Sequence, residues 1–188
     1  MPRFVFIEPQ APNIHIFSQY PLPRLGVIIL GTMMKQRGWE VEVYVEDLRR
    51  IDFEVVAGAD FVGISTITST APRAYAIADK VRAMGIPVLM GGPHVTFLTE
   101  EALAHADFVI RGEGERPLMA LIDAWEEGRD LSGTPNLSFK TADGRFVHNP
   151  LLPVAEDLDT LPHLDLALPK PDPRRRKFPT TIPIQTSR

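Results

Sequence analysis

Residues 59–65 read Ala-Asp-Phe-Val-Gly-Ile-Ser, and residues 87–94 read Pro-Val-Leu-Met-Gly-Gly-Pro-His. Each stretch is a short apolar run that ends in small or polar residues, which is typical of a buried strand in a parallel sheet. Between them, the spacing of apolar residues up to Gly85 predicts a helix, with Thr70 as its cap and Pro72 in its first turn. A strand, a helix and a second strand in this order favour parallel pairing through a right-handed crossover.

The same alternation continues on both sides of this unit. Strands also fit residues 3–7, 39–45 and 107–110, and helices fit residues 25–37 and 117–127, with a shorter helix opening at 99. Strands that alternate with helices in this way form a parallel sheet covered by helices on both faces. The sequence therefore predicts an α/β fold with a five-stranded parallel, flavodoxin-like (Rossmann-like) sheet in the order 2-1-3-4-5.

The pattern changes after residue 133. Residues 136–140 and 145–149 flank Thr-Ala-Asp-Gly, and Asp-Gly favours the tight turn of a β-hairpin. Prolines crowd residues 151–179 without a clear period, which indicates an extended linker over the surface. We therefore divide the chain into a Rossmann-like domain at 1–133, a hairpin appendage at 134–150, the linker at 151–179 and, at 180–188, the first strand of a further domain.

Composition narrows the classes of function. The 188 residues carry a formal net charge of −4 and include no cysteine. An acidic chain is a poor match for nucleic acid, whose affinity comes largely from clustered Lys and Arg. Without cysteine, the chain itself has no disulfide and no thiolate ligand for zinc or an iron–sulfur cluster. No stretch approaches the roughly 20 apolar residues of a membrane span, so we expect a cytoplasmic protein with neither a nucleic acid nor a membrane as its partner.

Small and polar residues follow the expected strands at one edge of the sheet. Ligands of open parallel sheets bind outside the carboxyl ends of the strands, so these residues form the candidate site. Glycine permits close backbone approach, and hydroxyls supply hydrogen bonds without fixed charge. The candidates are Pro9 after the first strand, Ser65, Thr66 and Thr68 after the third, Gly91, Gly92 and His94 after the fourth, and Gly112 and Glu113 after the fifth. His94 could equally be a plain turn residue.

Four segments resemble, in order and spacing, those of the cobalamin (vitamin B12)-binding domains of radical S-adenosylmethionine (SAM) enzymes. They are the Pro-rich loop after the first strand, Gly63-Ile64-Ser65, Gly91-Gly92-Pro93-His94 and Arg111-Gly112-Glu113-Gly114-Glu115. Residues 154–162 resemble the linker of that family. Residues 183–188 resemble the barrel strand that leads into its cluster loop, so the resemblance covers nearly the whole chain.

The resemblance implies cobalamin as the cofactor. Its nucleotide tail would lie between the third and fourth strand ends, in contact with Ser65, Thr66, Thr68, Gly91 and Gly92, and Gly112 and Glu113 would lie near the corrin or the tail. The resemblance also implies a radical SAM barrel, absent from this chain, that holds a [4Fe–4S] cluster and SAM. That barrel would carry the catalytic residues and would act on an unknown small-molecule or peptide substrate by methyl transfer or radical rearrangement. A surface that the barrel covers could make this chain dimerise.

The loop after the first strand bears on the cobalt ligand. Mutase-type cobalamin domains carry Asp-x-His-x-x-Gly there, and the histidine is the lower ligand of cobalt. Residues 13–18 offer His15 but lack both the Asp, which would orient the imidazole, and the Gly. We therefore predict a cobalt without a protein histidine, and no metal ligand in this chain.

Three other functions share this fold class. A phosphoacceptor receiver domain needs an Asp after the third strand, where Ser65 stands. A dinucleotide-binding domain needs Gly-x-Gly-x-x-Gly after the first strand, where the loop is Pro-rich. The third is an inherited cobalamin fold that binds no cofactor and only packs on a radical SAM barrel or shapes its substrate pocket, because fold alone does not guarantee function.

Overall fold

Five parallel strands make up most of the sheet in the computed structural model, which describes residues 1–12, 23–153 and 158–170. The strands are β1 (Arg3–Glu8), β2 (Glu40–Val45), β3 (Phe61–Ser65), β4 (Val88–Gly91) and β5 (Phe108–Ile110). They are ordered β2-β1-β3-β4-β5, as the alternating pattern predicted. Because the strands run parallel, all five carboxyl ends meet at one edge of the sheet.

The predicted count of five strands is wrong, because the hairpin joins the same sheet. Strands β6 (Leu137–Lys140) and β7 (Phe146–His148) extend it to seven, with β6 antiparallel to β5 and β7 antiparallel to β6. Asn136 makes the connection, since its backbone adopts φ 58° and its carbonyl accepts the N–H of Arg111 at 3.0 Å. The hairpin thus pairs with the free edge of β5.

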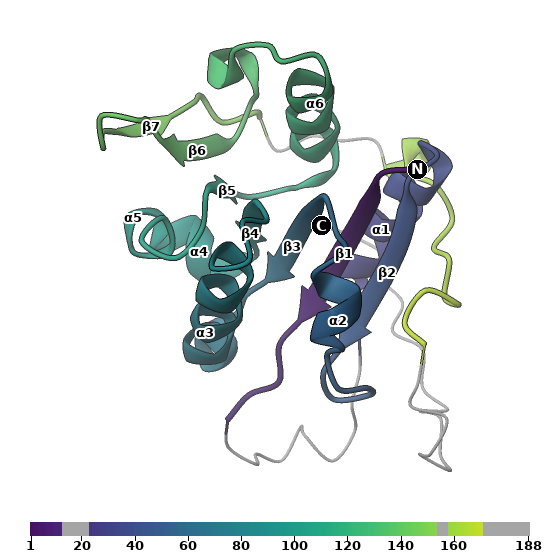
Figure 1. The fold of residues 1–188 in the computed structure, drawn as a ribbon. Coiled ribbons are helices and arrows are strands. Elements are labelled where there is room, and N and C mark those ends of the chain that lie inside the picture. Colours follow the sequence, from purple (N-terminus) through teal and green to yellow (C-terminus); the bar gives the residue numbers. More distant parts are fainter. Residues whose placement is uncertain (13–22, 154–157, 171–188) are drawn as a thin grey trace.

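Helices cover both faces of the sheet (Figure 1). One face packs against α1 (Leu25–Gln36) and α6 (Glu115–Glu126), and the other against α2 (Phe53–Val56), α3 (Ala71–Arg82), α4 (Pro93–Phe97) and α5 (Thr99–Ala102). Short 3₁₀ turns lie at η2 (Thr68–Thr70), η3 (Leu131–Gly133) and η4 (Leu158–Thr160).

Two local expectations on the α3 face need correction. Helix α4 was not predicted, because Pro93 was assigned to a turn. Thr70 makes no side-chain cap for α3, because its hydroxyl exchanges hydrogen bonds with the backbone of Ile67 instead. The 3₁₀ turn η2 therefore leads directly into α3.

The described part of the expected linker packs against the domain. We call residues 159–170 the strap. Its Leu168 is 6% exposed and packs in the same core as α1 and α6, and Pro169 forms an isolated parallel bridge with Val43 of β2. Most residues of the strap are exposed or half-buried, and Leu168 shows that a run without periodicity can still bury a single apolar side chain.

Some expectations lie outside the described residues. These are His15 and the strand expected within residues 180–188. Within the described ranges, no helix is long and apolar enough to cross a membrane. The proposed domain boundaries at 133, 150 and 179 stay predictions.

Candidate functional site

A cavity of about 1280 Å³ opens at the carboxyl edge of the sheet, on the face that α1 and α6 cover. Its floor follows from the sequence of the strands, because alternate residues of a strand share a face. On this face β3 presents Phe61, then Gly63, then Ser65, and β4 presents Leu89, then Gly91. The side chains shrink toward the carboxyl ends, and this leaves a hollow between the sheet and the helices.

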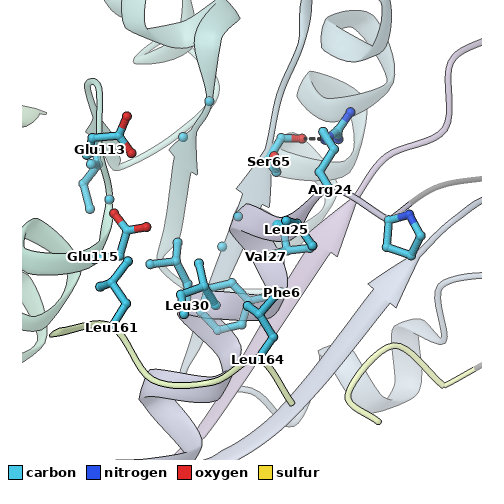
Figure 2. Close-up of a pocket in the computed structure, with 18 of the residues that line it drawn as sticks. Phe6, Arg24, Leu25, Val27, Leu30, Ser65, Glu113, Glu115, Leu161 and Leu164 are labelled. Atoms are coloured by element: carbon cyan, nitrogen blue, oxygen red, sulfur yellow. Dashed lines mark hydrogen bonds between the residues drawn. The ribbon is translucent and has the colours of Figure 1, made fainter. Parts of the chain in front are cut away.

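The walls of the cavity come from three places (Figure 2). The start of α1 supplies Arg24 to Val27 and Leu30, and the turn after β5 supplies Gly112 to Glu115. The strap supplies the third wall, from which Leu164 rises beside Phe6 and Leu161 rises below Glu115 in this view. The inner surface is mostly apolar, whereas charged and hydroxyl groups lie around it.

Arg24 ties the start of α1 to two strand ends. Its backbone N–H donates to Glu8 Oε2 at 2.8 Å, and its Nη2 donates to the Ser65 carbonyl at 3.2 Å. Arg24 Nε also lies 3.7 Å from Glu8 Oε1. Burial raises the pKa of the Glu8 carboxyl, and the charge of Arg24 acts against that rise. The cavity wall therefore contains a guanidinium held by a buried carboxyl group.

The glycine turn after β4 is built around Thr66. Gly92 has φ 103°, and a Cβ at this position would lie 2.5 Å from the Thr66 carbonyl oxygen. That carbonyl accepts the N–H of His94 at 3.3 Å, and the Thr66 N–H donates to the Gly91 carbonyl at 2.8 Å. The ends of β3 and β4 are thus joined, and only glycine fits at 92.

A second glycine turn follows β5. The Gly112 N–H donates to Thr96 Oγ1 at 3.0 Å, and Asn136 Nδ2 donates to the Glu113 carbonyl at 3.3 Å. The turn is therefore fixed from α4 on one side and from the hairpin on the other. Two segments that are far apart in the sequence therefore hold this part of the cavity wall in place.

The structure brings some of the predicted site residues together and leaves others apart. Ser65, Gly91, Gly92, Gly112 and Glu113 line the cavity. The remaining four are not among the lining residues: Pro9 and Thr66 are buried, Thr68 is exposed on η2, and His94 points into a separate cluster.

That cluster lies between α3, α4 and α5. His94 Nδ1 lies 3.3 Å from Thr68 Oγ1, and His94 Nε2 lies 3.1 Å from the Tyr75 hydroxyl. Burial and the neighbouring Glu101 carboxylate raise the pKa of Tyr75. His94 is therefore a packed, hydrogen-bonded residue on the far face of the sheet, rather than a plain turn residue.

Sequence reasoning missed the walls from α1 and the strap. The expected site residues all follow directly after a strand. Arg24, Leu30 and the strap also line the cavity, but they are far from any strand end in the sequence. One signal was available: Gly91 ends β4 on the cavity side of the sheet, where a larger residue would have filled the hollow.

The described residues contain no group of three or more His, Cys, Asp or Glu side chains that could hold a metal ion. The cavity is suited to an organic ligand with an apolar part, since such sites are mostly apolar with a few placed polar groups.

Comparison with known proteins identifies the family. Residues 16–122, more than half of the chain, match the model of the B12 binding domain. An uncharacterized methyltransferase of Pyrococcus horikoshii is 34% identical over 151 residues, which are 74% of this chain and 32% of that protein. The bacteriochlorophyllide d C-8(2)-methyltransferase of Chlorobaculum tepidum is 47% identical over 64 residues, 34% of this chain and 14% of that protein. The chain thus spans a third or less of these relatives.

Two solved structures share the fold. The radical SAM methyltransferase TsrM of Kitasatospora setae, with cobalamin and a [4Fe–4S] cluster bound, matches with a TM-score of 0.67 and 22% identity over 86% of this chain and 31% of that one. The cobalamin-dependent radical SAM enzyme OxsB, with aqua-cobalamin bound, matches with a TM-score of 0.65 and 17% identity over 82% of this chain and 23% of that one. The family model and the shared architecture agree, and the chain belongs to the B12 binding domain family.

Proposed function

We propose that the chain is the cobalamin-binding domain of a radical SAM enzyme. The observation that carries the proposal is the cavity at the carboxyl edge of the sheet, in a chain of the B12 binding domain family. Two relatives are named as methyltransferases, and a relative from Rubrivivax gelatinosus is named as an anaerobic magnesium-protoporphyrin IX monomethyl ester cyclase, so the proposal covers methyl transfer and other radical reactions alike. The radical SAM barrel, its [4Fe–4S] cluster and SAM would be supplied by the rest of the enzyme, as would the site for the substrate.

The residues of the cavity fit the nucleotide tail of cobalamin, which combines an apolar heterocycle with a sugar and a phosphodiester. Phe6, Leu30 and Leu89 offer apolar surface deep in the cavity, where the heterocycle would pack. Gly91 leaves open space, because the nearest atom to a Cβ there would be 3.9 Å away. Ser65 and the turn at Gly112 and Glu113 would face the more polar parts of the tail.

Each group of the chain would have a defined task. The glycines let the tail approach the backbone, the apolar floor excludes water from the heterocycle, and Arg24 offers a cation to the phosphodiester at the cavity wall. Bound cobalamin would supply a cobalt centre able to carry a methyl group. We assign no catalytic residue to this chain.

We also propose that no histidine of the chain ligates the cobalt. His94 is engaged by Tyr75 and Thr68 on the other face of the sheet. His163 lies exposed on the strap at the cavity wall, so His163→Ala belongs in the test. The visible spectrum of bound cobalamin should lack the signature of a nitrogen ligand and should not change in this variant; a change would identify His163 as a ligand.

The first experiment titrates the purified chain with hydroxocobalamin, removes free cofactor by desalting and records the visible spectrum. Gly91→Leu would fill the cavity from its floor, whereas Gly133→Leu makes the same change in open space at η3, away from the cavity. We expect the wild type and Gly133→Leu to retain cobalamin and Gly91→Leu to lose it. Absence of retention by the wild type would favour the rival function, a scaffold that packs on a radical SAM barrel without holding the cofactor.

A further inference from the structure

We infer that the strap is part of the cofactor site and selects corrinoids that carry a nucleotide tail. The inference rests on the proposed function and deepens it, because it assigns tail recognition to a segment that the sequence indicated only as a linker. Its basis is the position of the strap, the way it is anchored and the apolar surface that it presents.

The strap closes one side of the cavity. Six of its residues line the wall: Asp159, Leu161, Pro162, His163, Leu164 and Leu166. In the view of Figure 2 the side chains of two of them rise from the strap toward the cavity, Leu164 beside Phe6 and Leu161 below Glu115. Both leucines are only half-buried, so they keep apolar surface that a ligand in the cavity would cover.

A polar anchor fixes the strap on α1 beside these leucines. The Asp165 N–H donates to Thr32 Oγ1 at 2.9 Å, and Lys35 Nζ lies 2.7 Å from Asp165 Oδ2. The hydrogen bond to Lys35 lowers the pKa of Asp165. Thr32 is buried, so its hydroxyl is a fixed acceptor for the strap backbone.

An apolar anchor follows. Leu168 packs over Gly31 of α1, where a Cβ would lie 3.2 Å from Leu168 Cδ1 and 3.2 Å from Val43 Cγ2. A glycine in the middle of a helix costs about 1 kcal/mol relative to alanine, so its presence needs a reason. Here the absence of a side chain lets the strap lie close to the helix. Gly31 and Leu168 are not lining residues, so the anchor and the cavity wall are separate parts of the strap.

The strap therefore holds Leu161 and Leu164 in place before a ligand arrives. A preformed apolar wall favours a ligand with a flat apolar group that covers the half-buried surface of the two leucines. Cobalamin has such a group on its tail, whereas cobinamide has the same corrin ring and cobalt without the nucleotide. Loss of the two leucines should therefore weaken the binding of cobalamin and leave the binding of cobinamide unchanged.

The test compares the wild type with the double variant Leu161→Ser/Leu164→Ser. Leu151→Ser is the matched control, since Leu151 is 59% exposed and outside the cavity. The dissociation constants of hydroxocobalamin and aquocyanocobinamide are measured by visible spectroscopy. We expect the double variant to bind cobalamin about 10-fold to 100-fold more weakly, the loss expected for two apolar contacts, with less than a twofold change for cobinamide. The control should match the wild type for both.

The outcomes separate the two proposals. A double variant that binds cobalamin as tightly as the wild type overturns the role of the strap and leaves the proposed function standing. An equal loss for both corrinoids also overturns it, because the effect would not concern the tail; circular dichroism shows whether such a variant is folded. A wild type that binds cobalamin but not cobinamide supports tail recognition. The role of the strap is then decided by whether the double variant binds cobalamin more weakly than Leu151→Ser does. A wild type that binds neither corrinoid overturns the proposed function itself.

Discussion

Gly92 meets two demands at once, one on its backbone and one on its surroundings. Its φ of 103° is open to glycine but costly for other residues, and its missing side chain leaves room for the Thr66 carbonyl. The same residue lines the cavity. A methyl group in place of the glycine side chain would therefore disturb three features at once: the turn after β4, the pairing of the strand ends and the cavity.

Replacement of Gly92 by alanine should therefore destabilise the protein strongly. We expect a loss of more than about 3 kcal/mol in the free energy of unfolding, from the unfavourable φ and from the Cβ that would lie 2.5 Å from the Thr66 oxygen. Gly85→Ala is the control, because Gly85 has φ 78° but no atom within 4 Å of a Cβ, and it should lose only about 1 kcal/mol. Urea denaturation measures the free energy of unfolding of both variants. An equal loss of stability in the two would show that the contact with Thr66 is unimportant.

Among the elements, the hairpin and the strap illustrate what the sequence could not predict. The parallel strands and their order were predictable because continuous apolar runs alternate with helical spacing, and this pattern has few topologies. The pairing of β6 with β5 was not, since Leu137 and Phe139 identify a strand but not its partner. Leu168 packs far along the chain from its partner Gly31, and no local pattern encodes such a contact.

The same reasoning applies to the site. Ser65, Gly91, Gly92, Gly112 and Glu113 were found because the carboxyl edge of a parallel sheet is fixed by topology alone. Thr66 was assigned to the site although it turns its side chain into the protein, since alternation along the chain continues past the last residue of β3.

The attachment of the hairpin can be tested at Asn136. Its Nδ2 donates to the Glu113 carbonyl and its Oδ1 accepts the Leu152 N–H at 2.6 Å, while its backbone holds φ 58°. Asn136→Gly keeps the backbone conformation and loses both side-chain bonds, for an expected cost of about 2 kcal/mol. Asn136→Ala should cost about 1 kcal/mol more, because alanine disfavours this conformation. Denaturant unfolding of both variants checks the order, and a less stable glycine variant would contradict it.

For the whole molecule, ligand binding should appear as stability. A ligand that binds only the folded chain at 100 times its dissociation constant adds about 2.7 kcal/mol, and each kcal/mol raises the melting temperature of a chain of this length by about 2–4 °C. We therefore expect hydroxocobalamin at that excess to raise Tm by about 5–10 °C in calorimetry. The Gly91→Leu variant should show no rise, and a rise of equal size in that variant would place the cofactor elsewhere.

The bridge between Val43 and Pro169 has a consequence for how these molecules behave in a crowded solution. Strand β2 ends one side of the sheet, and an uncovered outer strand offers its peptide groups to the corresponding strand of another molecule, which is a route to aggregation. The strap lies along this side at Val43, and it does so with a proline, whose nitrogen has no hydrogen to offer to a further strand. Lys170, next in the chain, adds a charge beside Glu42. The strap thus has two roles. It forms one wall of the cavity, and it covers part of the outer strand against pairing with a strand of another molecule.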